Sequence, residues 1–370
     1  MLESRPFVSL VQSRLDDFLD TRDATLRHIG PDLAPFLQFS RDFLRGGKRF
    51  RASFCHWGWR AVVDAPGSGA DAWRALPSAG SMIGMAGALE VFHAAALVHD
   101  DIIDSSDTRR GSPAAHRRFE SEHRGAGWVG DAEAFGEAAA ILLGDLLLAW
   151  SDELVGDALA GLDAQAASAA RDEFNRMRTE VTLGQYLDVA EERAWPTVPE
   201  SDTLTRARRV IVHKSARYSV EAPLVIGARL GGAREEQVES LRAFGLPLGI
   251  AYQLRDDLLG VFGDAAVTGK PSGDDLREGK RTVLIAAARG RLARDDREEL
   301  DRLLGDPTLD IEAISRLQDR IVRSGAVAEV EDMIDAHVSE ALDVLNRAPL
   351  SAPAVDELTR LADSVTRRTS

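Results

Sequence analysis

Apolar residues recur at the spacing of an α-helix along nearly all of the 370 residues, whereas the alternating pattern of a half-buried strand is scarce. Good helix formers, chiefly Ala, Leu, Arg and Glu, fill these segments. The pattern therefore predicts an all-α protein with many helices. We expect them over residues 8–20, 33–45, 81–104, 133–159, 165–190, 203–230, 235–262, 280–303, 311–322 and 326–347.

The breaks between these segments are short and carry the Gly, Pro and Ser of loops, at residues 64–80, 123–131, 192–202 and 348–353. None is long or biased enough to act as a flexible linker, and no internal repeat is visible. We therefore expect residues 1–370 to form one domain, a helical bundle. Segments 81–104 and 133–159 are apolar on nearly all sides, as the central helices of a large bundle are.

Charge and cysteine content exclude several classes of protein. The formal net charge of −15 argues against a nucleic-acid partner and against a basic membrane-binding patch. Cys55 is the single cysteine, which excludes an intramolecular disulfide and a cysteine-based zinc site and suits the reducing cytosol. No stretch approaches the roughly 18 uninterrupted apolar residues of a membrane span. We expect a cytoplasmic protein without a membrane span.

Residues 97–111 read LVHDDIIDSSDTRRG and follow an apolar run. Asp100 and Asp104, at i and i+4, project from one helix face, with Asp101 about 100° around the helix. Buried carboxylates are costly unless they are paired or bind metal, and single carboxylate oxygens suit Mg²⁺ that also binds substrate phosphate. The alternative is a solvated helix end, which the preceding apolar run and the following arginines disfavour. We call these three residues the first aspartate cluster.

A second apolar helical segment ends in the same way. Residues 252–260 read YQLRDDLLG, and Asp256 and Asp257 form the second aspartate cluster. Two such clusters, far apart in the sequence, predict two facing halves of one metal site. The sequence shows no His/Cys pattern typical of a transition-metal site.

The complementary basic residues lie in GGKRFRA at 46–52, in the pair Arg109 and Arg110, and at Lys214, Lys270 and Lys280. Arginine binds phosphate oxygens through two hydrogen bonds and lysine binds them as a point charge. GGKR lacks the spacing of a nucleotide-binding phosphate loop, which argues against an ATPase or kinase.

The order and spacing of these motifs resemble those of the trans-isoprenyl diphosphate synthases, or polyprenyl synthetases, and among them the geranylgeranyl diphosphate synthases. The motifs are GGKRFR, HDDIID with SSDTRRG, GQYLD at 184–188, Lys214, YQLRDD and the GK pair around 270–280. The motifs span about residues 40–285, and the last 85 or so residues match only in being helical. The resemblance implies an all-α bundle around a deep cavity, usually a homodimer. It also implies Mg²⁺-dependent, head-to-tail condensation of isopentenyl diphosphate with an allylic diphosphate.

The resemblance also implies roles for individual residues. Asp100, Asp104 and Asp256 would be the main ligands of about three Mg²⁺ ions, which Mn²⁺ can replace, with Asp101 and Asp257 in support. Lys48, Arg51, His93 and Arg110 match the isopentenyl diphosphate site. Arg109, Lys214, Lys270 and Lys280 match the allylic diphosphate site, with Ser215 and Gln253 beside the developing allylic cation. The catalytic set would be Asp100, Asp104, Lys214, Gln253 and Asp256.

Some positions depart from the family pattern or remain open. The second motif normally has a third aspartate, where this chain has Gly260. Because the first aspartate of that motif carries most of the metal binding in the family, we expect activity to survive. A lone histidine such as His93 is usually a core residue, but its motif position favours substrate binding. Gln185 and Asp188 either support the metal site or lie on the helix surface.

Three residues predict the product length. Farnesyl-length synthases commonly place an aromatic residue four or five positions before the first aspartate, where this chain has Ala95 and Ala96. Phe92 lies about 5.4 Å further along the helix, close to the length of one isoprene unit. The motif also lacks the two-residue insertion of one bacterial subgroup. These features predict a 20-carbon product, geranylgeranyl diphosphate, with longer polyprenyl or farnesyl diphosphate as alternatives.

Two other functions are less consistent with the motifs. A class I terpene cyclase shares the aspartate-rich motif but binds one diphosphate, so GGKRFR and the arginine pair argue against it. A non-catalytic partner subunit usually loses one aspartate motif or the lysines, and this chain retains nearly all of them.

Overall fold

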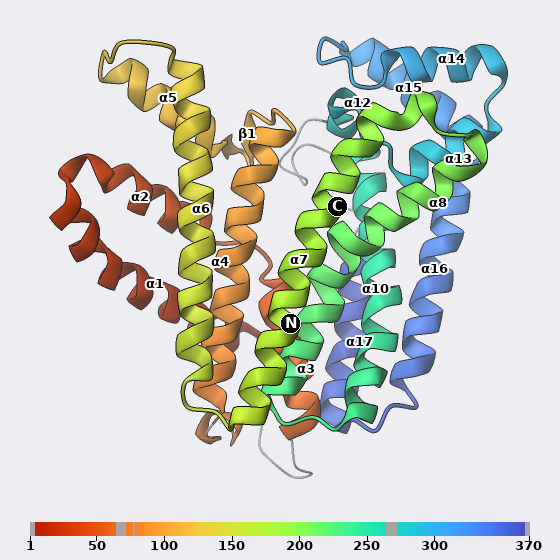
Figure 1. The fold of residues 1–370 in the computed structure, drawn as a ribbon. Helices are drawn as coiled ribbons and strands as arrows, with labels where there is room; N and C mark the ends of the chain where they lie inside the picture. The colour runs from red at the N-terminus through yellow and green to blue at the C-terminus, as the bar shows by residue number, and fades with distance from the viewer. Residues whose placement is uncertain (1–3, 64–71, 77, 264–271, 367–370) are drawn as a thin grey trace. The chain divides into compact units, whose positions relative to one another are not determined.

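The computed structural model describes residues 4–63, 72–76, 78–263 and 272–366, and the all-α prediction is confirmed (Figure 1). Within these ranges the extended structure consists of β1 (Thr108–Arg109) paired antiparallel with β2 (Ser112–Pro113). Short 3₁₀ turns occupy Pro31–Leu33, Ala72–Ala75 and Trp195–Thr197. The remaining described elements are helices and their connections.

The backbone groups into two compact units. The first unit contains residues 1–172 and 223–234, and the second contains residues 173–222 and 235–370. The expectation of a single domain stays a prediction. The helices of the first unit are α1 (Ser4–Ile29), α2 (Ala34–Phe43), α3 (Phe50–Val63), α4 (Ala79–Ile103), α5 (Ala115–Gly125), α6 (Ala132–Leu159) and α9 (Ala222–Leu230), together with the start of α7 (Ala164–Ala194).

In the first unit, α4 packs against α1, α3, α5 and α6. Small residues allow this close packing, since a Cβ on Gly84 would lie 3.1 Å from the Cβ of Ala158 in α6. Helices α3 and α9 approach even more closely: a Cβ on Gly58 would overlap the backbone of Leu224, and a Cβ on Gly227 would overlap that of Cys55. These contacts require glycine.

The second unit contains the rest of α7 and the helices α8 (Glu200–Val210), η4 (Ile211–Glu221), α10 (Glu235–Phe262), α12 (Asp274–Glu278), α13 (Val283–Arg291), α14 (Arg294–Leu303), α15 (Ile311–Arg323), α16 (Ala326–Leu345) and α17 (Ala352–Thr366). Helix α10 is central here and packs against η4, α12, α13, α16 and α17. Leu254, Leu258 and Val261 of α10 lie in a buried apolar core with residues of α13, α15 and α16.

The expected single helix over 203–230 is instead three segments, because Ile211–Glu221 forms a π-helix between α8 and α9. The wider π turn is rare and often marks a functional site. The expected helix over 280–303 is also wrong, because the chain leaves helical geometry at Leu292 and Ala293 between α13 and α14.

Four of the described helices were not expected: α3, α5, α12 and α17. Ten residues of α3 are buried and occupy all of its faces, so its sequence has no polar side to give a helical period. Helix α5 is highly charged: its sequence AHRRFESEHRG has few apolar residues, and its buried face also contains His116, Glu120 and His123.

Helix α4 is, among the described residues, the one with the length and apolarity of a membrane-spanning segment. Within the protein, 72% of its most apolar window is buried, as it is for the core helix of a globular protein.

Candidate active site

The first aspartate cluster lies at the end of α4. The carboxylate of Asp101 is fully buried and accepts a hydrogen bond from Nε of Arg109 at 2.8 Å. A second nitrogen of Arg109 lies 3.6 Å from Asp100. The helix stops because Ser105 has a left-handed φ of 53°, and the amide of Ser106 donates to the carbonyl of Asp101 at 2.8 Å. This turn leads into β1 and returns Arg109 to the cluster.

A group of basic residues surrounds His93 in the first unit. Burial lowers the pKa of His93 well below its usual value, and the positive charges of Arg51, Arg110, Arg109 and Arg49 lower it further. His93 is therefore neutral. The structure thus brings together three of the four residues expected to bind isopentenyl diphosphate.

The backbone of the basic loop, residues 46–52, helps to place these side chains. The guanidinium of Arg110 lies against Gly47, where a Cβ would come within 3.2 Å of its nitrogens. Lys48, the fourth expected residue, is exposed on this loop. The loop thus carries two of the four expected residues and contacts a third.

Arg49 is a buried residue of the basic loop that the sequence analysis did not single out. Its side chain is 4% exposed and pairs with Glu90 of α4 at 2.9 Å, and it also donates to Gln12 at 2.7 Å. Because Arg49 lies between Lys48 and Arg51, this buried pair fixes the basic loop to α4. The sequence does contain a sign of this pair: Glu90 lies within the apolar run GALEVFH, and a buried carboxylate needs a positively charged or hydrogen-bonding partner.

The second aspartate cluster lies on α10. Asp256 is exposed, whereas Asp257 is 5% exposed and accepts a hydrogen bond from Nε2 of Gln253 at 2.8 Å. Its other oxygen, Oδ2, is buried and has no hydrogen-bond partner within the described residues. Burial raises the pKa of Asp257 well above its usual value, and Asp275, Asp256 and Asp188 raise it further.

Lys214 and Ser215 lie in the π-helix η4. The ammonium of Lys214 pairs with Asp188 of α7 at 2.5 Å, and the Asp188 side chain is only 14% exposed. Asp188 is therefore not a surface residue. Helix α7 approaches this segment closely, because a Cβ on Gly184 would overlap the backbone amide of Lys214. Helix α10 does the same from Gly249, where a Cβ would lie 2.5 Å from the carbonyl oxygen of Ala216.

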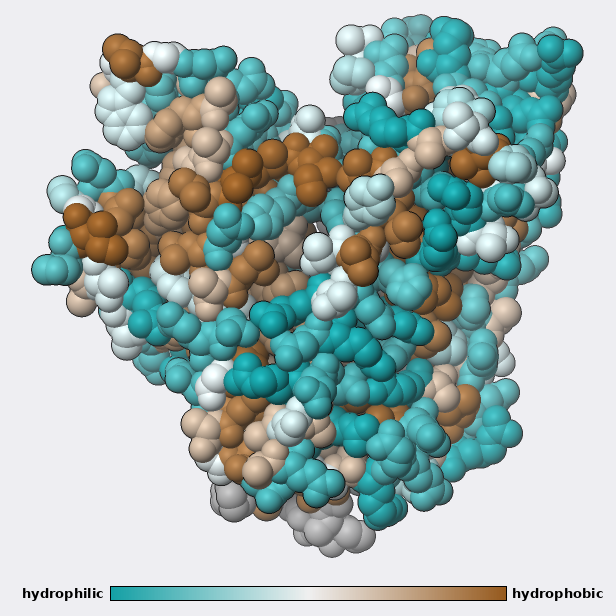
Figure 2. All heavy atoms as spheres, in the orientation of Figure 1, coloured by the Kyte–Doolittle hydropathy of each residue, from teal (hydrophilic) through white to brown (hydrophobic). Residues whose placement is uncertain are grey.

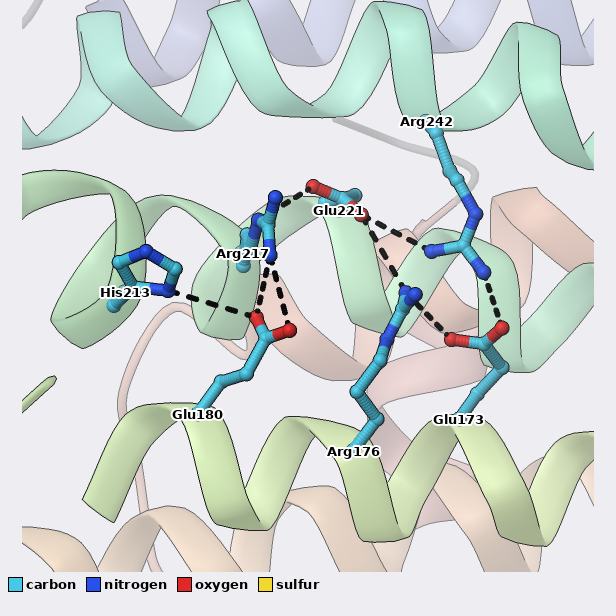
Figure 3. Close-up of polar contacts among 7 residues, drawn as sticks. All are labelled: Glu173, Arg176, Glu180, His213, Arg217, Glu221 and Arg242. Carbon is cyan, nitrogen blue, oxygen red and sulfur yellow. Dashed lines mark hydrogen bonds and ion pairs between the residues drawn. The ribbon is translucent and has the colours of Figure 1, made fainter. Parts of the chain in front are cut away.

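An ion-pair network continues along the same segment (Figure 3). Glu180 of α7 accepts hydrogen bonds from Arg217 at 3.0 Å and lies 3.9 Å from His213, so it contacts η4 on both sides of Lys214 and Ser215. Glu221, at the end of η4, lies 3.1 Å from Arg242 of α10. The network ties the π-helix to both neighbouring helices.

The remaining expected lysines lie after α10. Lys280 is 17% exposed and pairs with Glu278 at 2.7 Å, and its Nζ lies 4.0 Å from Asp275. Lys270 lies outside the described residues.

No three His, Cys, Asp or Glu side chains of the described ranges lie close enough together to hold a metal ion by themselves. Mg²⁺ commonly takes one or two carboxylates together with substrate phosphates rather than an all-protein cage. The buried Oδ2 of Asp257 is an oxygen that fits such a cation.

The three residues expected to set product length lie on α4. Phe92 is 4% exposed and Ala95 is fully buried, whereas Ala96 is partly exposed. Phe92 and Ala96 are four residues apart and share a helix face.

Asp145 of α6 lies outside these clusters: its side chain is 62% exposed and lies 3.5 Å from Nε2 of His99.

Residues 35–321 match the sequence model of the family described as polyprenyl synthetase. A geranylfarnesyl diphosphate synthase of Aeropyrum pernix is 32% identical over 297 residues, which cover 80% of this chain and 83% of that protein. A geranylgeranyl diphosphate synthase of Saccharolobus solfataricus is 29% identical over 345 residues, which cover 93% and 90%. A similar crystal structure is that of a geranylgeranyl pyrophosphate synthase from Corynebacterium glutamicum, complexed with isoprenyl diphosphate and magnesium. Its sequence is 37% identical to this chain. The structural match covers 100% of this chain and 99% of that chain, with a TM-score of 0.91.

The all-α fold, the two aspartate clusters and the basic residues near them define an enzyme of the prenyltransferase class. The chain belongs to the polyprenyl synthetase family, because the family model covers more than half of it. The resemblance inferred from the motifs is thereby confirmed.

Proposed function

We propose that the enzyme condenses isopentenyl diphosphate head to tail with allylic diphosphates and releases geranylgeranyl diphosphate. The observation that supports this most is that one chain retains both aspartate clusters, the basic loop and Lys214. The Corynebacterium glutamicum relative, whose structure contains isoprenyl diphosphate and magnesium, supports the same substrates and metal.

Isopentenyl diphosphate binds at the basic residues of the first unit. Arg51 and Arg110 supply paired hydrogen bonds to its phosphates, and Lys48 adds a mobile charge. His93 stays neutral because burial and the nearby arginines lower its pKa. A neutral imidazole can donate one hydrogen bond to phosphate without adding charge.

The allylic diphosphate binds Lys214, Lys270, Lys280 and Arg109. Lys214 is already held by Asp188, so its ammonium is positioned before substrate arrives. Gln253 has an oriented amide, because its Nε2 donates to Asp257. Its Oε1 and the hydroxyl of Ser215 are left to stabilise positive charge on the allylic carbon.

Asp100, Asp104 and Asp256 would hold about three Mg²⁺ ions, or Mn²⁺ in their place, with Asp101 and Asp257 in support. When bound, the metal neutralises the departing diphosphate. The clusters fit such ions because they offer carboxylate oxygens, including the buried Oδ2 of Asp257.

Cleavage of the allylic carbon–oxygen bond releases diphosphate and leaves an allylic cation. The isopentenyl double bond attacks this cation, and the adduct then loses a proton to the released diphosphate. Lysine and arginine side chains stabilise the developing charge of the leaving group. No side-chain nucleophile is needed, so the protein binds, orients and excludes water.

Product length is set on α4. A growing tail passes Ala96 and meets Phe92, which stops it at 20 carbons. The relatives include both geranylgeranyl and geranylfarnesyl diphosphate synthases, so chain length needs a direct test.

A homodimer is also proposed. Ile141 and Leu142 of α6 are 45% and 59% exposed, and apolar atoms are visible along this helix in Figure 2. Exposed apolar side chains on one helix are suited to contact a second copy.

The test is to incubate the protein with isopentenyl diphosphate, Mg²⁺ and an allylic diphosphate of 5, 10 or 15 carbons, and to measure product length. Phe92→Ala should lengthen the product, and Ala96→Phe should shorten it to 15 carbons or fewer. An unchanged product distribution in Phe92→Ala would place the stop on another helix. Absence of any condensation product would overturn the function.

A further inference from the structure

Helix α5 contacts both basic elements that are expected to bind isopentenyl diphosphate, the β1–β2 hairpin and the basic loop. The helix is held in place by α6: a Cβ on Gly136 of α6 would lie 2.4 Å from the carbonyl oxygen of His116, so the two backbones are in close contact. No step of the condensation uses α5. Its two adjacent arginines, Arg117 and Arg118, nevertheless each bind one of these basic elements or the residues that lead into it.

Arg117 holds the hairpin at the residue that precedes β1. Its Nε donates to Oδ1 of Asp107 at 2.6 Å, and the amide of Ala114 donates to the carbonyl oxygen of Asp107 at 2.9 Å. The same guanidinium donates to Glu120 of α5 at 2.8 Å and to Glu133 of α6 at 3.1 Å. Arg117 therefore joins the start of the hairpin to two helices at once.

The hairpin needs this support because its turn is strained. Arg110 and Gly111 link β1 to β2 with left-handed φ values of 53° and 75°. A left-handed backbone is costly for a residue with a side chain, and it persists where the surrounding contacts enforce it. Arg109 and Arg110 both lie in this hairpin, so the anchor at Asp107 helps to set where their guanidinium groups point.

Arg118 holds the end of α2, which leads into the basic loop. Its guanidinium donates to Oδ2 of Asp42 at 2.7 Å, and its Cζ lies 3.7 Å from the centroid of the Phe39 ring. Phe119 of α5 also packs on Phe39, with 4.8 Å between the ring centroids. Asp42 is in the last turn of α2, and the basic loop begins at residue 46. The contact with α5 therefore fixes the point from which the loop starts.

We propose that Arg117 and Arg118 are positioning residues, which hold the hairpin and the basic loop at the separation that isopentenyl diphosphate requires. Neighbouring residues of a helix point about 100° apart, so one rigid helix can bind two elements on different sides. The two elements meet where the guanidinium of Arg110 lies against Gly47. A diphosphate bound by residues of both elements is sensitive to their separation, because misplaced binding groups lose affinity.

This inference rests on the proposed function, and a comparison of the two substrates distinguishes positioning from a purely structural role. The side chains of Arg117 and Arg118 are 30% and 24% exposed, so loss of their ion pairs should change stability little. Arg117→Gln and Arg118→Gln should each raise KM for isopentenyl diphosphate about 3- to 10-fold. KM for the allylic substrate and kcat should stay within about twofold of the wild type.

Arg124→Gln is the matched control, because it removes an ion pair that lies within α5, between Arg124 and Glu120 at 2.6 Å. Both KM values should stay within about twofold of the wild type. Arg118→Lys keeps a positive charge beside Asp42 and should restore most of the affinity for isopentenyl diphosphate. Arg117→Lys should restore less, because lysine lacks the fork of donors that binds three carboxylates. Initial rates with one substrate varied at a time give KM, and thermal unfolding reports stability.

The outcomes separate the two proposals. If the wild type makes no prenyl product, the proposed function fails. If the wild type is active but both glutamine variants keep its KM for isopentenyl diphosphate, the positioning role is wrong and the function stands. An equal rise in both KM values, or a lower unfolding temperature with unchanged KM, would also overturn it, because the ion pairs would then be structural only. Should either variant fail to fold, Asp107→Asn or Asp42→Asn removes the partner of the same ion pair and decides in its place.

Discussion

The two aspartate clusters follow the same sequence pattern but balance their buried charge differently. In the first cluster, the fully buried Asp101 accepts a hydrogen bond from the charged guanidinium of Arg109 at 2.8 Å. In the second, Asp257 accepts one from the neutral amide of Gln253, and burial raises its pKa well above the usual value. The first cluster thus has a positive charge beside its buried carboxylate, whereas Asp257 has a neutral hydrogen-bond donor and a pKa that burial raises.

This difference shows that a motif specifies which residues are present but not the electrostatic state they adopt. A buried carboxylate needs a positive partner, and either an arginine or a metal ion can provide it. The first cluster has an arginine, because Arg109 contacts both Asp100 and Asp101. In the second, the hydrogen bond to Asp257 comes from the neutral amide of Gln253, so a bound cation would bring a positive charge that this hydrogen bond does not supply.

The largest expected effect is on turnover. Asp100→Ala or Asp256→Ala should lower kcat by about 10³-fold or more, because metal stabilisation of the leaving group contributes several kcal/mol. Steady-state kinetics with saturating Mg²⁺ measure the loss, and circular dichroism checks the fold. Near wild-type turnover in either variant, or in excess chelator, would show that the cluster does not hold the catalytic metal.

The two buried aspartates should respond in opposite ways to neutralisation in the absence of metal. Asp101→Asn should lower stability by about 3 kcal/mol, because it leaves Arg109 partly buried without its partner. Asp257→Asn should raise stability at pH 8, because asparagine keeps the hydrogen bond to Gln253 without a buried charge. Thermal unfolding of both variants measures the effect, and a loss in both would contradict the comparison.

The pH dependence of the Asp257 effect has a defined sign. The folded pKa of Asp257 lies above its unfolded value. Between the two values the native state binds more protons, so stability falls as pH rises through that window. The advantage of Asp257→Asn should therefore shrink at low pH, where the wild-type carboxyl is protonated in both states. An advantage that grew on acidification would contradict the raised pKa.

The basic residues of the two units should separate in kinetics. Arg51→Ala should raise KM for isopentenyl diphosphate, and Lys214→Ala should raise KM for the allylic substrate, each about 10- to 100-fold as for a lost charged hydrogen bond. Initial rates with one substrate varied at a time measure the split. If both variants weakened the same substrate, the division between the units would be wrong.

The smallest expected effect is in the network that holds η4. Glu180→Gln weakens the contacts to His213 and Arg217, and should raise the allylic KM about fivefold through the position of Lys214. KM for isopentenyl diphosphate should stay unchanged. Glu180→Asp tests rescue by a shorter carboxylate, and Asp23→Asn, in an exposed pair of α1, is the control. A change in stability with an unchanged allylic KM would limit the network to a structural role.

The sequence alone determined the fold class, the two clusters and the basic residues, because these follow from local patterns. Helical periodicity is set by 3.6 residues per turn, so segments such as 81–104 and 235–262 are readable directly from apolar spacing. Prediction from the sequence failed where the helical period was weak, as in α3. It also failed where the backbone changed from α-helix to π-helix within a continuous pattern, as in η4.

Only the tertiary structure decided how the buried charges are balanced. Arg49 pairs with Glu90, which is 41 residues away in the sequence, and Lys214 pairs with Asp188, which is 26 residues away. The carboxylate of Asp275 lies where a Cβ on Gly260 would project. Each pairing depends on which helices pack together, and helix packing is governed by non-local contacts that leave no period in the sequence. The residue types specified that positive and negative charges must meet, and the packing of the helices determined which of them did.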